Sequence, residues 1–258
     1  METKRGLYLI TSYPQHGKSE LIKYLSYMAV TNYEWPISLF SPEEDTEDII
    51  EDLCRLYLGK NVNGKFGNQC SKYELEQAIE WVNKFYTFVE FDGMADFNTL
   101  LAQYESLAES GVKMFGTDPW NYVAEGNDEI GYKFLLTALT HMKTFSKRYE
   151  VHNVIVEHQN KPVPNKQTGA IPKATKWNIT GGQMWNKKCD CIIIPHSYWP
   201  EERDTTVEIE VVKVKNQRYN GSIGMVALDF DLKTGRYENK SFSSDQFIQS
   251  SIDDDEPF

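Results

Sequence analysis

The sequence has few cysteines and no long apolar run. Its 258 residues contain four cysteines, too few for the disulfide framework of a secreted protein. No apolar stretch reaches the ~18 residues that cross a bilayer, and no signal-peptide pattern opens the chain. Cys189 and Cys191 are separated by one residue, outside the usual spacing of zinc ligands. We therefore expect a soluble intracellular protein without a zinc site.

An overall excess of positive charge is also lacking, because the net charge is −11 at pH 7. This balance argues against indiscriminate binding of nucleic acids. The charge is uneven, with seven acids between Glu43 and Asp52, but nine lysines and arginines against three acids between Lys143 and Asp190. The basic stretch suits contact with a polyanion at one surface, and a solvated lysine-rich loop would give the same pattern.

The start of the chain contains a phosphate-loop pattern. Apolar residues 7–10 predict a buried strand, Gly17-Lys18-Ser19 follows, and a helical pattern begins at Ser19. In such a loop the backbone N–H groups and the helix N-terminus bind phosphates, the lysine reaches the β/γ-phosphates and the serine hydroxyl binds Mg²⁺. The motif is one glycine short because Ser12 replaces the first glycine, and an ordinary turn is the alternative. The candidate nucleotide-binding residues are Ser12, Pro14, Gln15, His16, Gly17, Lys18 and Ser19.

Strand and helix patterns alternate through most of the chain. The spacing of apolar residues predicts strands at 7–10, 36–40, 86–91, 112–115, 152–156, 190–195, 207–215 and 225–231. Helices are predicted at 19–29, 46–58, 73–84, 97–109 and 130–149. The alternation indicates an α/β fold with a mostly parallel sheet, and the last strands indicate an antiparallel extension. We expect one domain over residues 1–241 and an acidic, disordered tail over 242–258.

Three predicted strands end in residues that are useful for nucleotide chemistry. Phe40 precedes Glu43 and Glu44, Phe115 precedes Asp118, and Val156 precedes the run Glu157-His158-Gln159. Ligands in open α/β sheets bind at the carboxyl ends of the strands, where these groups would meet. A glutamate would orient or deprotonate the attacking water, Asp118 would hold Mg²⁺, and the run at His158 would sense the γ-phosphate. Each acid taken singly also fits a turn or a helix cap, and a lone histidine is more often simply packed.

Together these motifs resemble the ATPase domain of DnaB-like replicative helicases, above all the phage primase–helicases and mitochondrial Twinkle. The resemblance covers about residues 7–237 and implies a RecA-like P-loop NTPase core. Phe40-Ser-Pro-Glu43 resembles the family's second motif, which favours Glu43 over Glu44 as the catalytic carboxylate. Asp118-Pro-Trp-Asn resembles its Walker B motif, and His158-Gln-Asn-Lys its sensor motif.

Two later segments carry the same resemblance. Residues 178–187 resemble the segment that contributes a DNA-binding loop, and the run from Arg218 to Gly224 resembles the final motif. The arginine of that motif acts on the nucleotide of the neighbouring subunit. Its spacing is irregular here, so Lys215 is the alternative to Arg218. The candidate DNA-binding residues are Lys173, Lys176, Gly181, Gly182 and Lys187.

The resemblance implies an ATP-dependent DNA replication helicase that hydrolyses an NTP at subunit interfaces and moves along single-stranded DNA. The implied catalytic residues are Lys18, Glu43, Asp118, His158 and Arg218, the Mg²⁺ ligands are Ser19 and Asp118, and the cofactors are ATP or another NTP with Mg²⁺. The protein would be a homo-oligomer, expected to be a hexamer, in the cytoplasm of a bacterial cell or encoded by its phage. A RecA-type recombinase or loader, which binds DNA without unwinding it, is one alternative. A P-loop protein that is not a motor, such as a small-molecule kinase or a defence sensor, is another.

Both ends of the chain carry further expectations. These helicases have a primase or helical domain and a linker before the core, whereas six residues precede the first predicted strand here. We expect a fragment, one product of a split gene or a reduced ATPase. Residues 253–258, Asp-Asp-Asp-Glu-Pro-Phe, resemble the acidic tip of bacterial single-stranded DNA-binding proteins. This tip would dock on a polymerase, primase or loader, and a solubilising terminus is the alternative.

Overall fold

The computed structural model describes residues 5–62, 69–124, 131–169, 171–198 and 204–239. Within these ranges the main sheet has nine strands in the order β11-β10-β9-β8-β1-β7-β5-β2-β3. Their bounds are β1 Gly6–Ser12, β2 Ile37–Phe40, β3 Tyr86–Phe88, β5 Met114–Thr117, β7 His152–His158, β8 Cys191–Ser197, β9 Thr206–Val214, β10 Gly224–Phe230 and β11 Tyr237–Asn239. A separate parallel pair joins β4 (Ala95–Asp96) to β6 (Val123–Ala124).

The six strands from β8 to β3 are parallel, and β9, β10 and β11 extend the sheet in antiparallel fashion. This arrangement confirms the predicted α/β fold. The central strands β1 and β7 are buried along most of their length, as expected for parallel strands that are covered on both faces. The antiparallel strand β10 is exposed or half-buried throughout.

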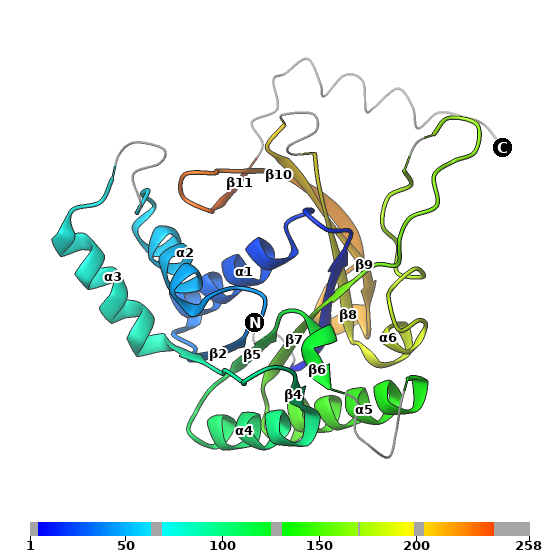
Figure 1. Cartoon of the computed structure of the whole chain (residues 1–258), viewed down its shortest axis with the longest axis horizontal. Coiled ribbons are helices and arrows are strands. Elements are labelled where there is room, and N and C mark those ends of the chain that lie inside the picture. Colours follow the sequence, from blue (N-terminus) through cyan, green and yellow to red (C-terminus); the bar gives the residue numbers. More distant parts are fainter. Residues whose placement is uncertain (1–4, 63–68, 125–130, 170, 199–203, 240–258) are drawn as a thin grey trace.

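Helices cover both faces of the sheet (Figure 1). On one face α1 (Lys18–Tyr33), α2 (Thr46–Leu58) and α3 (Lys72–Phe85) pack over one apolar cluster. On the other face α4 (Phe97–Glu109), α5 (Tyr132–Arg148) and α6 (Met184–Lys188) pack over a second cluster that contains Trp120 and Trp185. The two clusters form the core and fix the edge of the sheet at which the parallel strands end.

Local signals explain why the longer helices match the predictions. The α2 helix has the predicted bounds and ends at Gly59, whose φ of 61° is the left-handed conformation favoured by glycine. The α3 helix begins with a capping box between Ser71 and Glu74. The α4 helix begins at Asp96, whose carboxylate accepts a hydrogen bond of 2.9 Å from the Thr99 N–H.

The differences from the predictions concern short elements. The strand predicted at 86–91 is only β3, and α5 starts two residues later than the 130–149 pattern indicates. The sequence gives no sign of β4, β6, α6, the 3-10 helix η1 (Trp120–Tyr122) or α7 (Gln217–Asn220). The tail predicted at 242–258 lies outside the described residues. Within the described ranges, no helix combines the length and the apolar character needed to cross a membrane.

Candidate functional site

The β1–α1 loop has the geometry of a phosphate-binding loop. Gln15 and Gly17 both have positive φ, 66° and 79°, and α1 begins directly after them at Lys18. The unpaired N–H groups at the start of this helix therefore face the loop and attract anions. Lys18 is 6% exposed, and its Nζ donates a hydrogen bond of 2.9 Å to the Tyr13 carbonyl.

The loop is attached to β8 at two points. Ser12 is fully buried at the end of β1, and its Oγ donates a hydrogen bond of 2.6 Å to the Pro195 carbonyl. Nδ1 of His16 accepts a hydrogen bond of 3.1 Å from the Ser197 N–H, and its ring stacks on His196 with centroids 4.6 Å apart. Pro14 and Gln15 are exposed at the tip. The serine that replaces the motif's glycine thus has a hydrogen-bonding partner.

Asp118 and Ser19 form an oxygen pair beside the loop. Asp118 follows β5, is 7% exposed, and is fixed by its N–H, which donates 2.9 Å to the Phe40 carbonyl. Burial raises the pKa of its carboxyl to about 6, although a side-chain hydrogen bond to Ser19 acts in the opposite direction. A hydroxyl and a carboxylate at this spot fit the hard-oxygen preference of Mg²⁺.

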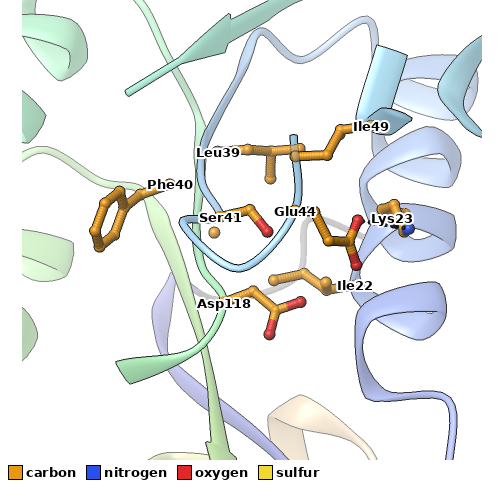
Figure 2. A pocket seen from close by; sticks show the side chains of 9 residues that line it. Ile22, Lys23, Leu39, Phe40, Ser41, Glu44, Ile49 and Asp118 are labelled. Carbon is orange, nitrogen blue, oxygen red and sulfur yellow. Dashed lines mark hydrogen bonds and ion pairs between the residues drawn. The ribbon is translucent and has the colours of Figure 1, made fainter. Parts of the chain in front are cut away.

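The two glutamates after β2 have different surroundings. Lys23 on α1 is 5% exposed, and its Nζ lies 3.0 Å from the Glu44 carboxylate, 2.5 Å from Asp52 and 3.2 Å from Glu20. Burial alone would lower the pKa of Lys23, but these carboxylates together raise it above its usual value. Figure 2 shows the Glu44 carboxylate directed at Lys23, with the Asp118 carboxylate apart from it.

Glu43, in contrast, faces the phosphate loop. Its Oε1 lies 4.0 Å from Nε2 of His158, at the end of β7, and its charge acts on Lys18. Burial, together with the nearby Lys18, lowers the pKa of His158. The structure thus brings Lys18, Ser19, Glu43, Asp118 and His158 together at one edge of the sheet.

A further acid lies at this edge. Glu157 is 4% exposed, and its Oε1 accepts a hydrogen bond of 2.7 Å from the His158 N–H. Burial raises the pKa of its carboxyl to about 7, and the charge of Lys18 opposes that rise.

A small apolar cavity adjoins the loop on its other side. The cavity has a volume of ≈ 140 Å³, with Gln15 and Gly17 on one wall and Phe230 and Tyr237 on the other. The rings of Phe230 and Tyr237 pack with centroids 5.0 Å apart. The antiparallel extension therefore returns to the loop and closes one side of the site.

The candidate DNA-binding residues are spread over three segments. The 178–182 segment pairs with the end of β7, because the Thr180 N–H donates 2.9 Å to the His158 carbonyl. Gly181 and Gly182 follow with φ of 82° and 83°, and Lys187 is exposed on α6.

Lys173 and Lys176 lie against β9. Lys173 is ion-paired with Glu208, and Nζ of Lys176 donates 3.3 Å to the Val212 carbonyl. The same ammonium group lies 5.3 Å from the ring of Trp177, which is 65% exposed. Figure 1 shows the segment between β7 and α6 projecting from the body of the domain.

Arg218 lies at the opposite end of the parallel strands from Lys18. It belongs to α7, which follows β9, and the last residue of β9, Val214, pairs with the first residue of β8, Cys191. Since β8 runs parallel to β1, α7 lies where the parallel strands begin. The seven residues of β1 separate the two ends by about 20 Å at ~3.3 Å per residue. Lys215, the alternative to Arg218, lies at the same end, where its N–H donates 2.7 Å to the Asp190 carbonyl.

No family model matches the chain, and no curated protein matches it in sequence. Solved structures do match. The solved ATPase domain of one DnaB-like replicative helicase superposes with a TM-score of 0.76 at 15% identity, covering 93% of this chain and 86% of that one. A second DnaB-like replicative helicase, described with its interactions with primase, superposes with a TM-score of 0.74 at 17% identity. That match covers 93% of this chain and 60% of the helicase. The chain has the fold of a DnaB-like helicase ATPase domain.

The helicase ATPase fold confirms the RecA-like core expected from the motifs. The sequence did not reveal three features of the site: the Lys23 cluster, the buried state of Glu157 and the return of Tyr237 to the loop. Lys23 at helical spacing from Glu20 was the one available signal, since side chains three residues apart are neighbours on a helix. Nothing in the sequence indicates that β11 lies against the loop, because that contact depends on the order of strands in the sheet.

Proposed function

We propose that this chain is the motor domain of a DnaB-like DNA helicase, which hydrolyses ATP or another NTP with Mg²⁺ to move along single-stranded DNA. One observation carries the proposal. Lys18, Ser19, Asp118, Glu43 and His158 come from four different strand ends and converge beside the N-terminus of α1. An ordinary turn with a chance Gly-Lys-Ser sequence gives no reason for Glu43, Asp118 and His158 to gather there.

The chemistry follows from the charges of these groups. Lys18 and the N–H groups at the start of α1 would bind the β- and γ-phosphates. Ser19 and Asp118 would hold Mg²⁺, which supplies further positive charge to the phosphates when bound. Glu43 is 43% exposed and so can reach a water molecule, whereas Glu44 is held by Lys23. The aromatic cavity at Phe230 and Tyr237 adjoins the loop and would receive the nucleotide base.

Hydrolysis would require a neighbouring subunit. An arginine that neutralises charge in the transition state contributes about 10³–10⁵ in rate. Arg218 lies about 20 Å from its own phosphate loop, on the ~3.3 Å rise per strand residue. It would therefore serve the nucleotide of the next protomer in a homo-oligomer, which we propose is a hexamer in the cytoplasm.

Single-stranded DNA would contact the projecting 161–178 segment and α6. Trp177 offers an exposed ring for base stacking, and the neighbouring Lys176 offers positive charge. Lys173, Lys187 and the Gly181-Gly182 backbone would add contacts to phosphates that do not depend on sequence. A replication partner would dock on the tail at 253–258, which lies outside the described residues.

The test is ATP hydrolysis by the purified chain with and without single-stranded DNA. We expect DNA to stimulate hydrolysis, and we expect Lys18→Ala to abolish it. Lys72→Ala is the matched control, because the Lys72 side chain is 90% exposed on α3 and should leave the rate unchanged. Hydrolysis that ignores DNA would overturn the motor proposal. DNA-stimulated hydrolysis without strand separation would favour a recombinase or loader.

A further inference from the structure

Glu157 is a buried acid beside the phosphate loop to which the proposed function gives no role. It lies on β7 directly before His158 and is 4% exposed. One of its oxygens accepts the His158 N–H at 2.7 Å. The carboxyl group therefore has a fixed position, a single orientation for Oε1 and little contact with bulk water.

The charged groups that act on Glu157 come from three elements. They are Lys18 at the start of α1, Glu43 after β2 and, next in sequence, His158. Lys18 is attracted by Glu157, Glu43 and Asp118 at the same time. In the nucleotide-free site, one ammonium group thus serves three carboxyl groups.

The opposite side of Glu157 faces an open cavity. This cavity has a volume of ≈ 500 Å³, and its walls include Trp120, Tyr132, Gly181 and Trp185. Its far wall belongs to the segment that we propose contacts DNA. Water in this cavity gives protons a route to the carboxyl group that does not pass through the phosphate loop.

Binding of a nucleoside triphosphate would change the charge around Glu157. Lys18 would turn to the phosphates, and the phosphates would bring additional negative charge. A buried carboxylate that loses a nearby ammonium and gains an anionic neighbour is destabilised relative to the neutral acid. The carboxyl group, already shifted toward the neutral form by burial, would then bind a proton from water.

We propose that Glu157 is a positioning residue that takes up one proton from solvent when a nucleoside triphosphate binds, which makes nucleotide binding at this site proton-linked. The inference rests on the proposed function only in that the loop must bind a triphosphate. In the neutral form Glu157 leaves Lys18 to the phosphates; in the ionised form it competes for Lys18. Nucleotide affinity therefore falls as pH rises, by up to about tenfold per pH unit.

The experiment is calorimetric titration of the full chain with Mg²⁺ and a non-hydrolysable ATP analogue. Performed near pH 8 in buffers of different ionisation enthalpy, it gives the number of protons taken up on binding. We expect the wild type to take up more protons than Glu157→Gln, with a difference approaching one. Lys18 and His158 are present in both proteins, so the difference isolates Glu157. Glu76→Gln is the matched control, because Glu76 is exposed on α3 and should match the wild type.

Equal proton uptake by the wild type and Glu157→Gln, with nucleotide bound to both, would overturn the inference and leave the proposed function standing. Absence of nucleotide binding to the wild type would overturn both. The glutamine can accept the His158 N–H as glutamate does, so we expect the variant to fold. Glu157→Asp gives a second reading, because it retains a titratable group and should retain proton uptake that Glu157→Ala loses.

Discussion

The hydroxyl of Ser12 donates a hydrogen bond of 2.6 Å to the carbonyl of Pro195, at the junction of β1 and β8. Both groups are buried, and the bond joins the start of the phosphate loop to the strand that leads into the antiparallel extension. The loop therefore has a side-chain anchor at the position where the usual motif has a glycine. The anchor explains how the departure from the motif is accommodated.

Replacing Ser12 with alanine should reduce stability more than nucleotide binding. The change leaves the buried Pro195 carbonyl without this donor, at a cost of about 1–3 kcal/mol in the free energy of unfolding. We expect urea unfolding to show this loss and nucleotide titration to give a Kd within about threefold of the wild type, or ~0.6 kcal/mol. Ser110→Ala, at an exposed helix end, is the control. A large loss of nucleotide affinity with unchanged stability would contradict the anchoring role.

Glu43→Gln and Glu44→Gln should differ sharply in activity. Loss of the group that orients or deprotonates the attacking water lowers turnover by about 10²–10⁴. We therefore expect Glu43→Gln to bind nucleotide but hydrolyse it at least about a hundredfold more slowly, on the same basis. Glu44→Gln should retain hydrolysis and lose stability, because Glu44 is held by Lys23. Steady-state hydrolysis and thermal unfolding of both variants provide the measurement, and the reverse result would assign the role to Glu44.

Lys23→Met should destabilise the domain. Lys23 is 5% exposed and is the shared partner of Glu20, Glu44 and Asp52. Removing it leaves these carboxylates near one another, at a cost of about 3 kcal/mol, the lower part of the range for a broken buried pair because the carboxylates are partly exposed. Urea unfolding measures the loss. Lys72→Met, which removes an exposed i,i+4 pair, should cost less than about 0.5 kcal/mol.

Mixing two inactive variants should restore hydrolysis. Lys18→Ala lacks a working phosphate loop but retains Arg218, whereas Arg218→Ala has the opposite defect. If Arg218 serves a neighbour, mixed oligomers contain some complete sites, and the rate should rise well above that of either variant alone. Lys215→Ala in place of Arg218→Ala is the control and should remain active by itself. Failure of complementation, with mixed oligomers shown by mass spectrometry, would exclude the trans-acting role.

Stability should depend on pH through Glu157. Its pKa is raised from 4.5 to about 7 in the folded protein, so the folded protein binds more protons than the unfolded chain within that window. Stability from this group is therefore present below about pH 4.5 and is lost as pH rises through about 7, a change of about 3 kcal/mol. Glu157→Gln lacks this loss, so its free energy of unfolding should exceed that of the wild type above pH 7 and approach it near pH 4.5. A pH-independent difference would contradict the raised pKa.

The sequence predicted the elements whose signals are local. The α2 and α4 helices have the predicted bounds because apolar residues recur at helical spacing and because Gly59 and Asp96 mark their ends. Elements of two to five residues, such as β4, α6 and α7, escaped prediction because a period of 3.6 or 2 needs more residues to be recognised.

The candidate site was predictable where it depends on strand ends and unpredictable where it depends on depth. Lys18, Asp118 and His158 follow predicted strands, and the parallel sheet brings them to one edge. Glu157 adjoins His158 in sequence, but its burial depends on the packing of Trp120 and Trp185 on the other face of the sheet. No local pattern encodes that packing.

The placement of Arg218 and Lys18 at opposite ends of the parallel strands has a consequence for symmetry. An assembly in which each arginine meets the next phosphate loop joins two different surfaces of the same chain, so its interface is heterologous. A two-fold dimer, which joins identical patches, forms no such contact. Repetition of a head-to-tail contact either closes as a ring or continues as a helical filament, and the rotation between successive subunits decides which. Every subunit in such an assembly gives an arginine to one neighbour and receives one from the other.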